Sequence, residues 1–217
     1  MDQQHPSPSR WAIVLAGGEG TRMQPLVHRW LGFNRPKQYC AFVGSRSMFQ
    51  HTVDRAALVT APERIVAVVG RDHRDEILTQ LQGRTIGQVI YQPRNCETAA
   101  GLFLPLTYIH ALAPDATVVI FPSDHFIHPE DRFLKAVCRI ADLAEARPDR
   151  LVLLGIRPDR LEMEYGWILP GAALSSQEDA PLCEVHSFME KPNRIQAVKA
   201  FRHGALWNTF VFAARAE

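Results

Sequence analysis

The sequence lacks paired cysteines and long apolar runs. Its four cysteines are far apart and none forms a C-x-x-C pair; they are Cys40, Cys96, Cys138 and Cys183. This spacing excludes the usual zinc ribbon and dithiol redox motifs, and it is typical of a protein from a reducing compartment. No run of about 18 consecutive apolar residues occurs, which excludes an ordinary membrane-spanning helix.

An excess of charge of one sign is also absent. The 24 lysines and arginines nearly balance the 23 aspartates and glutamates, so the formal net charge at pH 7 is +1. Neither a basic surface for nucleic acid nor an acidic tail is therefore indicated. Residues 1–10 are polar and have no apolar centre, unlike a signal peptide. We expect a flexible N-terminus and a cytoplasmic protein without nucleic acid or membrane partners; the sequence leaves open whether it forms a homo-oligomer.

Apolar residues make up 47% of the 217 positions, enough for a substantial core. Up to residue 156, short β-branched runs alternate with longer segments of helical spacing. This alternation predicts an α/β fold, a Rossmann-like layered domain with a mostly parallel central sheet. The predicted strands are 11–15, 64–69, 88–91, 117–121 and 151–156, and the predicted helices are 48–59, 97–112 and 130–146.

After residue 156 the pattern changes, because two predicted strands follow each other without a helix between them. The small, polar segment that joins them predicts a loop. We expect a small antiparallel flap here, followed by one more helix and one more strand. The predicted strands are 164–170, 182–188 and 206–213, the loop is 171–180 and the helix is 193–203.

A glycine-rich segment follows the first predicted strand. Gly17, Gly18 and Gly20 permit positive φ and a close approach that side chains would block. Consecutive amides in such a loop bind anions, and the guanidinium of Arg22 suits phosphate oxygens. The glycines alone also fit a tight turn without a ligand. The dinucleotide fingerprint is excluded because Met23 stands where it needs glycine, and the P-loop is excluded because no Gly-Lys-Ser/Thr follows.

An acidic residue, Asp124, lies just beyond the strongest predicted strand, 117–121. Because the carboxyl ends of parallel strands share one sheet edge, we expect the glycine loop, the segment from Gln92 and the segment around Asp124 to converge. A carboxylate beside a phosphate loop suits Mg²⁺, and helix capping is the alternative role. The next helix is predicted to begin only near residue 130, which favours the metal role of Asp124.

Longer patterns carry a more specific signal than the glycines. L-A-G-G-E-G-T-R-M-Q-P-L at 15–26, followed by R-P-K-Q at 35–38, resembles the signature of the sugar nucleotidyltransferases. The P-K-Q ending is most similar to the mannose-1-phosphate guanylyltransferases. Further segments resemble the same family, namely P-S-D-H at 122–125, Y-G-W-I at 165–168, F-M-E-K-P at 188–192 and W-N at 207–208.

The resemblance implies transfer of a nucleotidyl group from a nucleoside triphosphate, expected to be GTP, to a sugar 1-phosphate, expected to be mannose 1-phosphate, with Mg²⁺ as cofactor. One domain, 11–217, would have a nucleotide-binding half at 11–156 and a sugar-binding half at 157–217. By match of position, the catalytic residues are Arg22, Lys37 and Asp124, and Asp124 binds the metal. The residues matched to nucleotide binding are Leu15, Ala16, Gly17, Gly18, Gly20, Thr21, Gln92, Asn95 and Thr98, and those matched to the sugar phosphate are Tyr165, Gly166, Glu190, Lys191 and Asn208.

The sequence departs from the family pattern at two places. Cys96-Glu97 and Ala100 intervene in the segment matched to base reading, and Thr209 and Phe210 follow the W-N pair. Two other functions stay open: transfer from UTP or dTTP to glucose 1-phosphate, and a non-catalytic sugar-nucleotide-binding regulatory module.

The family's second metal-binding aspartate lies beyond the W-N segment, and no residue up to Glu217 matches it. Relative to the family pattern the sequence is shortened at its C-terminus. One carboxylate fewer should weaken metal binding, so we expect weak or absent turnover from these 217 residues alone.

Overall fold

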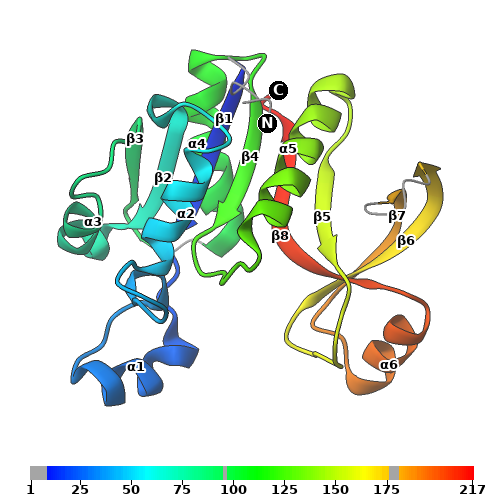
Figure 1. The fold of residues 1–217 in the computed structure, drawn as a ribbon, viewed down its shortest axis with the longest axis horizontal. Helices are drawn as coiled ribbons and strands as arrows, with labels where there is room; N and C mark the ends of the chain where they lie inside the picture. Colours follow the sequence, from blue (N-terminus) through cyan, green and yellow to red (C-terminus); the bar gives the residue numbers. More distant parts are fainter. Residues whose placement is uncertain (1–8, 95–96, 176–180) are drawn as a thin grey trace. The chain divides into compact units, whose positions relative to one another are not determined.

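The computed structural model, shown in Figure 1, describes residues 9–94, 97–175 and 181–217. The chain divides into two compact units. Unit 1 contains the residues up to Val152 together with Phe212–Glu217, and unit 2 is Leu153–Val211. The expected halves, 11–156 and 157–217, differ from these bounds mainly because the last residues of the chain return to unit 1.

The sheet of unit 1 is parallel over four strands in the order β3-β2-β1-β4. The last part of β8 pairs antiparallel with β4, with Ala213 opposite Val119. The centres of β1, β2 and β4 are almost wholly buried, as expected for parallel strands covered on both faces. The strands are β1 (Arg10–Ala16), β2 (Ile65–Gly70), β3 (Gln88–Gln92), β4 (Thr117–Pro122) and β8 (Leu206–Arg215).

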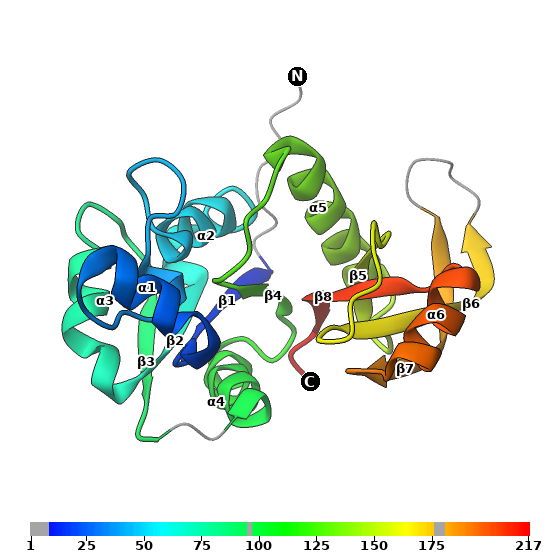
Figure 2. The ribbon, with the colours of Figure 1, turned by 90° about the horizontal axis from the view of Figure 1, so that it is seen from below.

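Helices cover both faces of this sheet. Figure 2 shows α2 (Met48–Ala56) and α5 (Glu130–Ala146) on one side and α4 (Glu97–Leu112) on the other. A capping box holds the start of α2, where the Ser47 hydroxyl accepts from the amide of Gln50 and the Gln50 side chain accepts from the amide of Ser47. The predicted α/β architecture is confirmed, and α4 and α5 have the predicted bounds.

Unit 2 is rich in strands. β6 (Gly166–Ser175) pairs antiparallel with β7 (Leu182–Glu190) and with the first part of β8, and β5 (Val152–Ile156) also pairs with β8. The helix α6 (Arg194–Arg202) contributes two alanines to a core built around two tryptophans. The members of this core are Trp167, Ala197, Ala200, Ala205 and Trp207. The predicted antiparallel flap is therefore confirmed.

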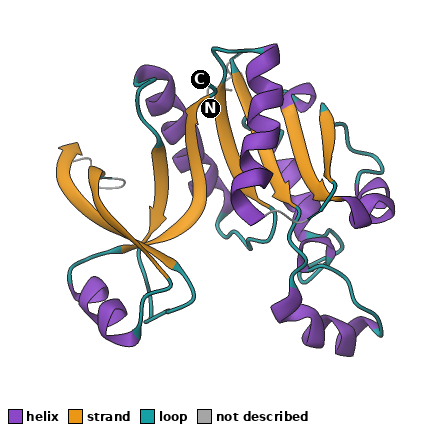
Figure 3. Cartoon of the chain, turned by 180° about the vertical axis from the view of Figure 1, so that it is seen from behind, coloured by secondary structure: helices purple, strands orange, loops and turns teal. Residues whose placement is uncertain are grey.

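Two features of the structure were not predicted, and one prediction was wrong. The short helices α1 (Gln24–Leu31) and α3 (Arg74–Gln80) were missed because they are only eight and seven residues long and bury few side chains. Residues 171–175 belong to β6 rather than to a loop. β6 stays paired with β7 over this mostly exposed stretch, and the register shifts along it accompany the curvature seen in Figures 1 and 3. Residues 176–180 lie outside the described part of the chain.

The predicted flexible segment 1–10 needs a correction at its end. Residues 1–8 lie outside the described part, but Arg10 is the first residue of β1 and is 8% exposed. Its guanidinium pairs with Asp142 and, at 2.8 Å, with Glu145, both on α5. This interaction ties the first strand to a helix more than a hundred residues away.

None of the helices in the described part of the chain combines the length and the apolar character that a membrane span needs.

Replacing Arg10 by alanine should lower the free energy of unfolding by about 2 kcal/mol, because Asp142 and Glu145 would lose their partner. Urea unfolding followed by circular dichroism measures the change. The control is Arg150→Ala, which removes an exposed ion pair with Asp149 and should change the free energy by less than about 1 kcal/mol. Equal losses in the two variants would show that the Arg10 contacts do not stabilise the fold.

Candidate functional site

The glycine loop begins where β1 ends, at the carboxyl edge of the parallel sheet. A Cβ on Gly17 would lie 2.6 Å from Oε1 of Gln92 at the end of β3, so no larger residue fits there without a shift. On the other side, the amide and hydroxyl of Ser123 donate to the carbonyl of Leu15 at 3.1 and 2.6 Å. The predicted convergence of the loops after β1, β3 and β4 is confirmed.

The resemblance predicts that Gln92 faces a base, and in the structure its side chain lies beneath the glycine loop. It is 5% exposed, and its Nε2 lies 3.4 Å from the position of a Cβ on Gly101 in α4. Thr98 is exposed in the first turn of α4. Asn95 lies outside the described residues.

The loop also touches the R-P-K-Q segment. Gly20 has φ of 61°, in the left-handed region that favours glycine, and a Cβ there would lie 3.2 Å from the amide nitrogen of Lys37. Thr21 and Arg22 follow in a short 3₁₀ turn, and both are exposed. The structure therefore brings the loop glycines and Lys37 into one place.

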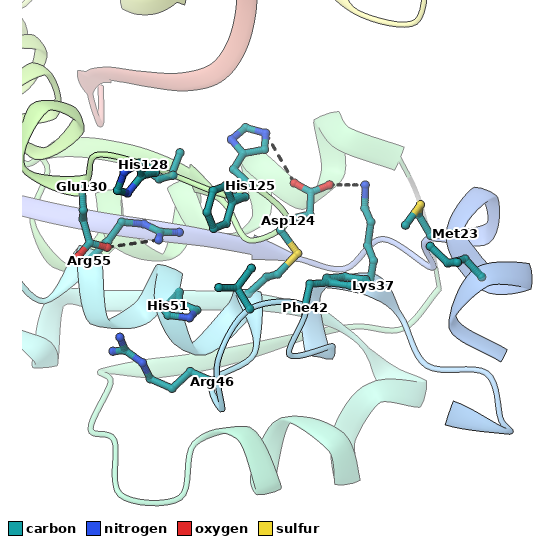
Figure 4. Close-up of a pocket in the computed structure, with 15 residues that line it drawn as sticks. Met23, Lys37, Phe42, Arg46, His51, Arg55, Asp124, His125, His128 and Glu130 are labelled. Atoms are coloured by element: carbon teal, nitrogen blue, oxygen red, sulfur yellow. Dashed lines mark hydrogen bonds and ion pairs between the residues drawn. The ribbon is translucent and has the colours of Figure 1, made fainter. Parts of the chain in front are cut away.

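Lys37 forms an ion pair with Asp124, with 2.6 Å between Nζ and Oδ2 (Figure 4). Nε2 of His125 lies 3.7 Å from the other carboxylate oxygen. Burial acts to raise the pKa of Asp124, but His125 and Lys37 outweigh it and hold the pKa below its ordinary value. Burial lowers the pKa of His125, although Asp124 acts to raise it. Asp124 is thus a carboxylate at neutral pH, next to an ammonium group.

Asp124 is also the residue matched to the metal. Within the described ranges, no group of three or more His, Cys, Asp or Glu side chains is arranged to hold a metal ion. Mg²⁺ in proteins is often held by one or two carboxylates together with water and substrate phosphates. The single carboxylate of Asp124 fits this kind of shared site, and it does not fit a site made of protein ligands alone.

A cavity of about 600 Å³ lies beside this ion pair (Figure 4). Lys37, Asp124 and His125 contribute to its wall, together with apolar side chains such as Phe42 and Met48. Its mixture of charged and apolar groups is usual for small-molecule sites.

In unit 2, the residues matched to the sugar phosphate also lie together. A Cβ on Gly166 would lie 2.8 Å from Oε2 of Glu190, 2.7 Å from Cζ of Phe188 and 3.3 Å from Cβ of Asn208. Gly166 begins β6, Glu190 ends β7 and Asn208 lies on β8. Their closeness follows from the antiparallel pairing, which places Gly166 opposite Glu190.

The backbone around these residues includes two non-glycine residues with positive φ, Lys191 at 44° and Phe210 at 57°. The amide of Lys191 donates to the carbonyl of Tyr165 at 3.2 Å, and the amide of Phe210 donates to Oδ1 of Asn208 at 3.0 Å. Such conformations are strained for these residue types and gather at functional sites. Oδ1 of Asn208 accepts the bond from Phe210, and the amide nitrogen of Asn208 carries the two N–H groups that can donate to a ligand.

Sequence patterns assigned no role to several residues that build this site. Gln38 and Tyr39 donate to carbonyls of the glycine loop, and Tyr39 also contacts the ring of His73. Gln38, Ser123 and His125 stand inside the segments that resemble the family, which was the available signal. Nothing in the sequence marked His73.

Comparison with known proteins finds relatives whose sequence similarity extends over almost the whole chain. The mannose-1-phosphate guanylyltransferase of Salmonella montevideo is 33% identical over 210 residues, covering 94% of this chain and 43% of that protein. The enzyme of the same name from Escherichia coli K12 is 32% identical over 211 residues, covering 95% of this chain and 43% of that protein. The chain thus spans less than half the length of these two relatives.

Solved structures agree with this comparison. The crystal structure of mannose-1-phosphate geranyltransferase from Thermus thermophilus matches with a TM-score of 0.79 and 28% identity, covering 96% of this chain and 58% of that chain.

The family model described as nucleotidyl transferase matches residues 11–217. The match covers unit 2 and nearly all of unit 1, and the chain therefore belongs to the nucleotidyl transferase family.

Proposed function

We propose that this protein transfers the nucleotidyl group of GTP to mannose 1-phosphate and releases pyrophosphate. The observation that carries the proposal is the contact of the glycine loop with Lys37 and of Lys37 with Asp124 at one sheet edge. The relatives named mannose-1-phosphate guanylyltransferase support the choice of GTP and mannose 1-phosphate. Three cysteines in the described part of the chain are free thiols, namely Cys40, Cys138 and Cys183. Free thiols are usual in the reducing cytoplasm, and we propose that the reaction takes place there.

The proposed reaction is an in-line displacement. A phosphate oxygen of the sugar 1-phosphate attacks the α-phosphorus of the triphosphate, the bond from that phosphorus to the β-phosphate oxygen breaks, and pyrophosphate leaves. A phosphate monoester is already a nucleophile, so no covalent enzyme intermediate is needed. Catalysis then rests on positioning the reactants and on neutralising their charge.

In this proposal the groups of unit 1 hold the triphosphate. The loop amides and the exposed residue Arg22 bind phosphate oxygens. The ammonium group of Lys37, which already pairs with Asp124, also contacts these phosphate oxygens. When bound, Mg²⁺ would be held by Asp124 with phosphate oxygens, and it would neutralise charge on the triphosphate.

The groups of unit 2 would bind the sugar 1-phosphate. The carboxylate of Glu190 accepts hydrogen bonds from hydroxyls, and the amide nitrogen of Asn208 donates to them. An acceptor and a donor beside Gly166 suit neighbouring hydroxyls of a sugar ring. Lys191 offers a positive charge to the sugar phosphate.

A panel of nucleoside triphosphates against sugar 1-phosphates tests the choice of substrates. GTP, ATP, CTP and UTP are each combined with mannose 1-phosphate and with glucose 1-phosphate, and pyrophosphate release is measured. We expect the fastest release with GTP and mannose 1-phosphate, and the rank order matters more than the absolute rate. Fastest release with UTP and glucose 1-phosphate would contradict the proposal.

Substituting Asp124 by alanine tests the catalytic role of the carboxylate. Pyrophosphate release should fall by about 10²-fold or more, because the Mg²⁺ that would neutralise charge on the triphosphate loses its carboxylate ligand. GTP binding, measured by isothermal titration calorimetry without Mg²⁺, should change little. Asp149→Ala alters an exposed aspartate and serves as the control. Unchanged release by Asp124→Ala would remove Asp124 from the catalytic residues.

A further inference from the structure

We propose that Gln38 is a positioning residue, which turns the amides of the glycine loop toward the triphosphate without touching it. The inference rests on the proposed function, since it concerns the same phosphate-binding loop. Gln38 is 3% exposed, so a ligand has almost no access to its side chain.

The buried side chain of Gln38 makes hydrogen bonds to the backbone at two positions of the glycine loop. Its Nε2 donates to the carbonyl of Ala16 at 2.9 Å and to the carbonyl of Gly18 at 2.7 Å. One carboxamide thus uses both of its N–H groups on two carbonyls of the same loop. The hydroxyl of Tyr39 adds a third bond, to the Ala16 carbonyl at 3.3 Å. Burial raises the pKa of Tyr39, so this phenol keeps its proton at neutral pH.

The orientation of the carbonyls fixes the orientation of the amides. In a planar trans peptide the C=O and the following N–H point in opposite directions. Because the carbonyls of Ala16 and Gly18 point at Gln38, the amides of Gly17 and Glu19 point away from it. Gly18 and Glu19 are exposed, so the Glu19 amide faces the accessible side of the loop.

A glycine loop without this restraint would have other conformations open to it. Gly17, Gly18 and Gly20 rotate more freely than any other residue type, and an anion that binds the loop must order them first. Two hydrogen bonds from a buried amide remove part of that disorder beforehand, which raises affinity by preorganisation. Gln38 should therefore control triphosphate affinity from beneath the loop.

The test compares Gln38→Met with the wild-type chain. Methionine has nearly the same size and lacks the donors. Isothermal titration calorimetry measures the binding of GTP and, separately, of mannose 1-phosphate. We expect GTP to bind at least about tenfold more weakly to Gln38→Met and mannose 1-phosphate to bind unchanged. Gln38→Asn is the second variant: its shorter amide cannot reach both carbonyls, so GTP binding should again weaken.

The matched control is Gln80→Met. Gln80 is 7% exposed, lies in unit 1 and also makes two side-chain hydrogen bonds, one accepted from Ser47 and one donated to Glu76. Among the described residues it makes no hydrogen bond to the glycine loop, so its replacement should lower the thermal unfolding temperature and leave GTP affinity unchanged.

Each outcome is decisive. Equal GTP binding by wild type and both Gln38 variants overturns the inference and leaves the proposed function standing. Parallel loss of both ligands in Gln38→Met, or the same loss of GTP in Gln80→Met, shows a structural effect and also overturns it. If the wild-type chain binds no triphosphate at all, the proposed function fails first, and the inference falls with it.

Discussion

Parallel pairing of β1 with β2 and β4 is the constraint on which the candidate site depends. The registers place Ala16 opposite Val69 and Leu15 opposite Pro122, so the strands end at nearly the same level. The glycine loop and the segment containing Asp124 must then leave the sheet side by side. The hydrogen bonds from Ser123 to the Leu15 carbonyl hold the ends of β1 and β4 next to each other.

A short 3₁₀ turn, Lys37–Tyr39, connects the parts of this edge. The side chain of Lys37 pairs with Asp124, whereas the side chains of Gln38 and Tyr39 donate hydrogen bonds to carbonyls of the glycine loop. The charge that would neutralise a triphosphate and the bonds that shape its binding loop therefore come from one turn. In unit 2, the pairing of the strands is by itself sufficient to make Gly166, Glu190 and Asn208 neighbours.

Local sequence patterns were sufficient for the parts of the fold whose packing is regular. The helices α4 and α5 are long, and the buried strands are continuous apolar runs, so their positions were predicted closely. The helices α1 and α3 escaped because they are short and bury little. The far end of β6 was taken for a loop because the segment 171–180 is small and polar as a whole, although its first five residues continue the strand.

The site divides in the same way. Gly17, Lys37 and Asp124 were found because their motifs resemble a family, and their proximity followed from the sheet edge. The bonds of Gln38 to the loop and of Arg10 to α5 could not be predicted, since they join positions distant in the sequence and leave no periodic trace. The sequence could name Gln92 as a candidate, but only the fold shows that its amide lies beneath Gly17.

The proposed function requires a nucleoside triphosphate to bind at the glycine loop of unit 1. Amide chemical shifts of the ¹⁵N-labelled protein, recorded during a titration with GTP, report on that binding residue by residue. We expect the largest shifts at Gly17, Gly18, Glu19 and Gly20, and we expect mannose 1-phosphate alone to leave these resonances in place. Saturable shifts confined to other residues, with the loop amides unmoved, would contradict it.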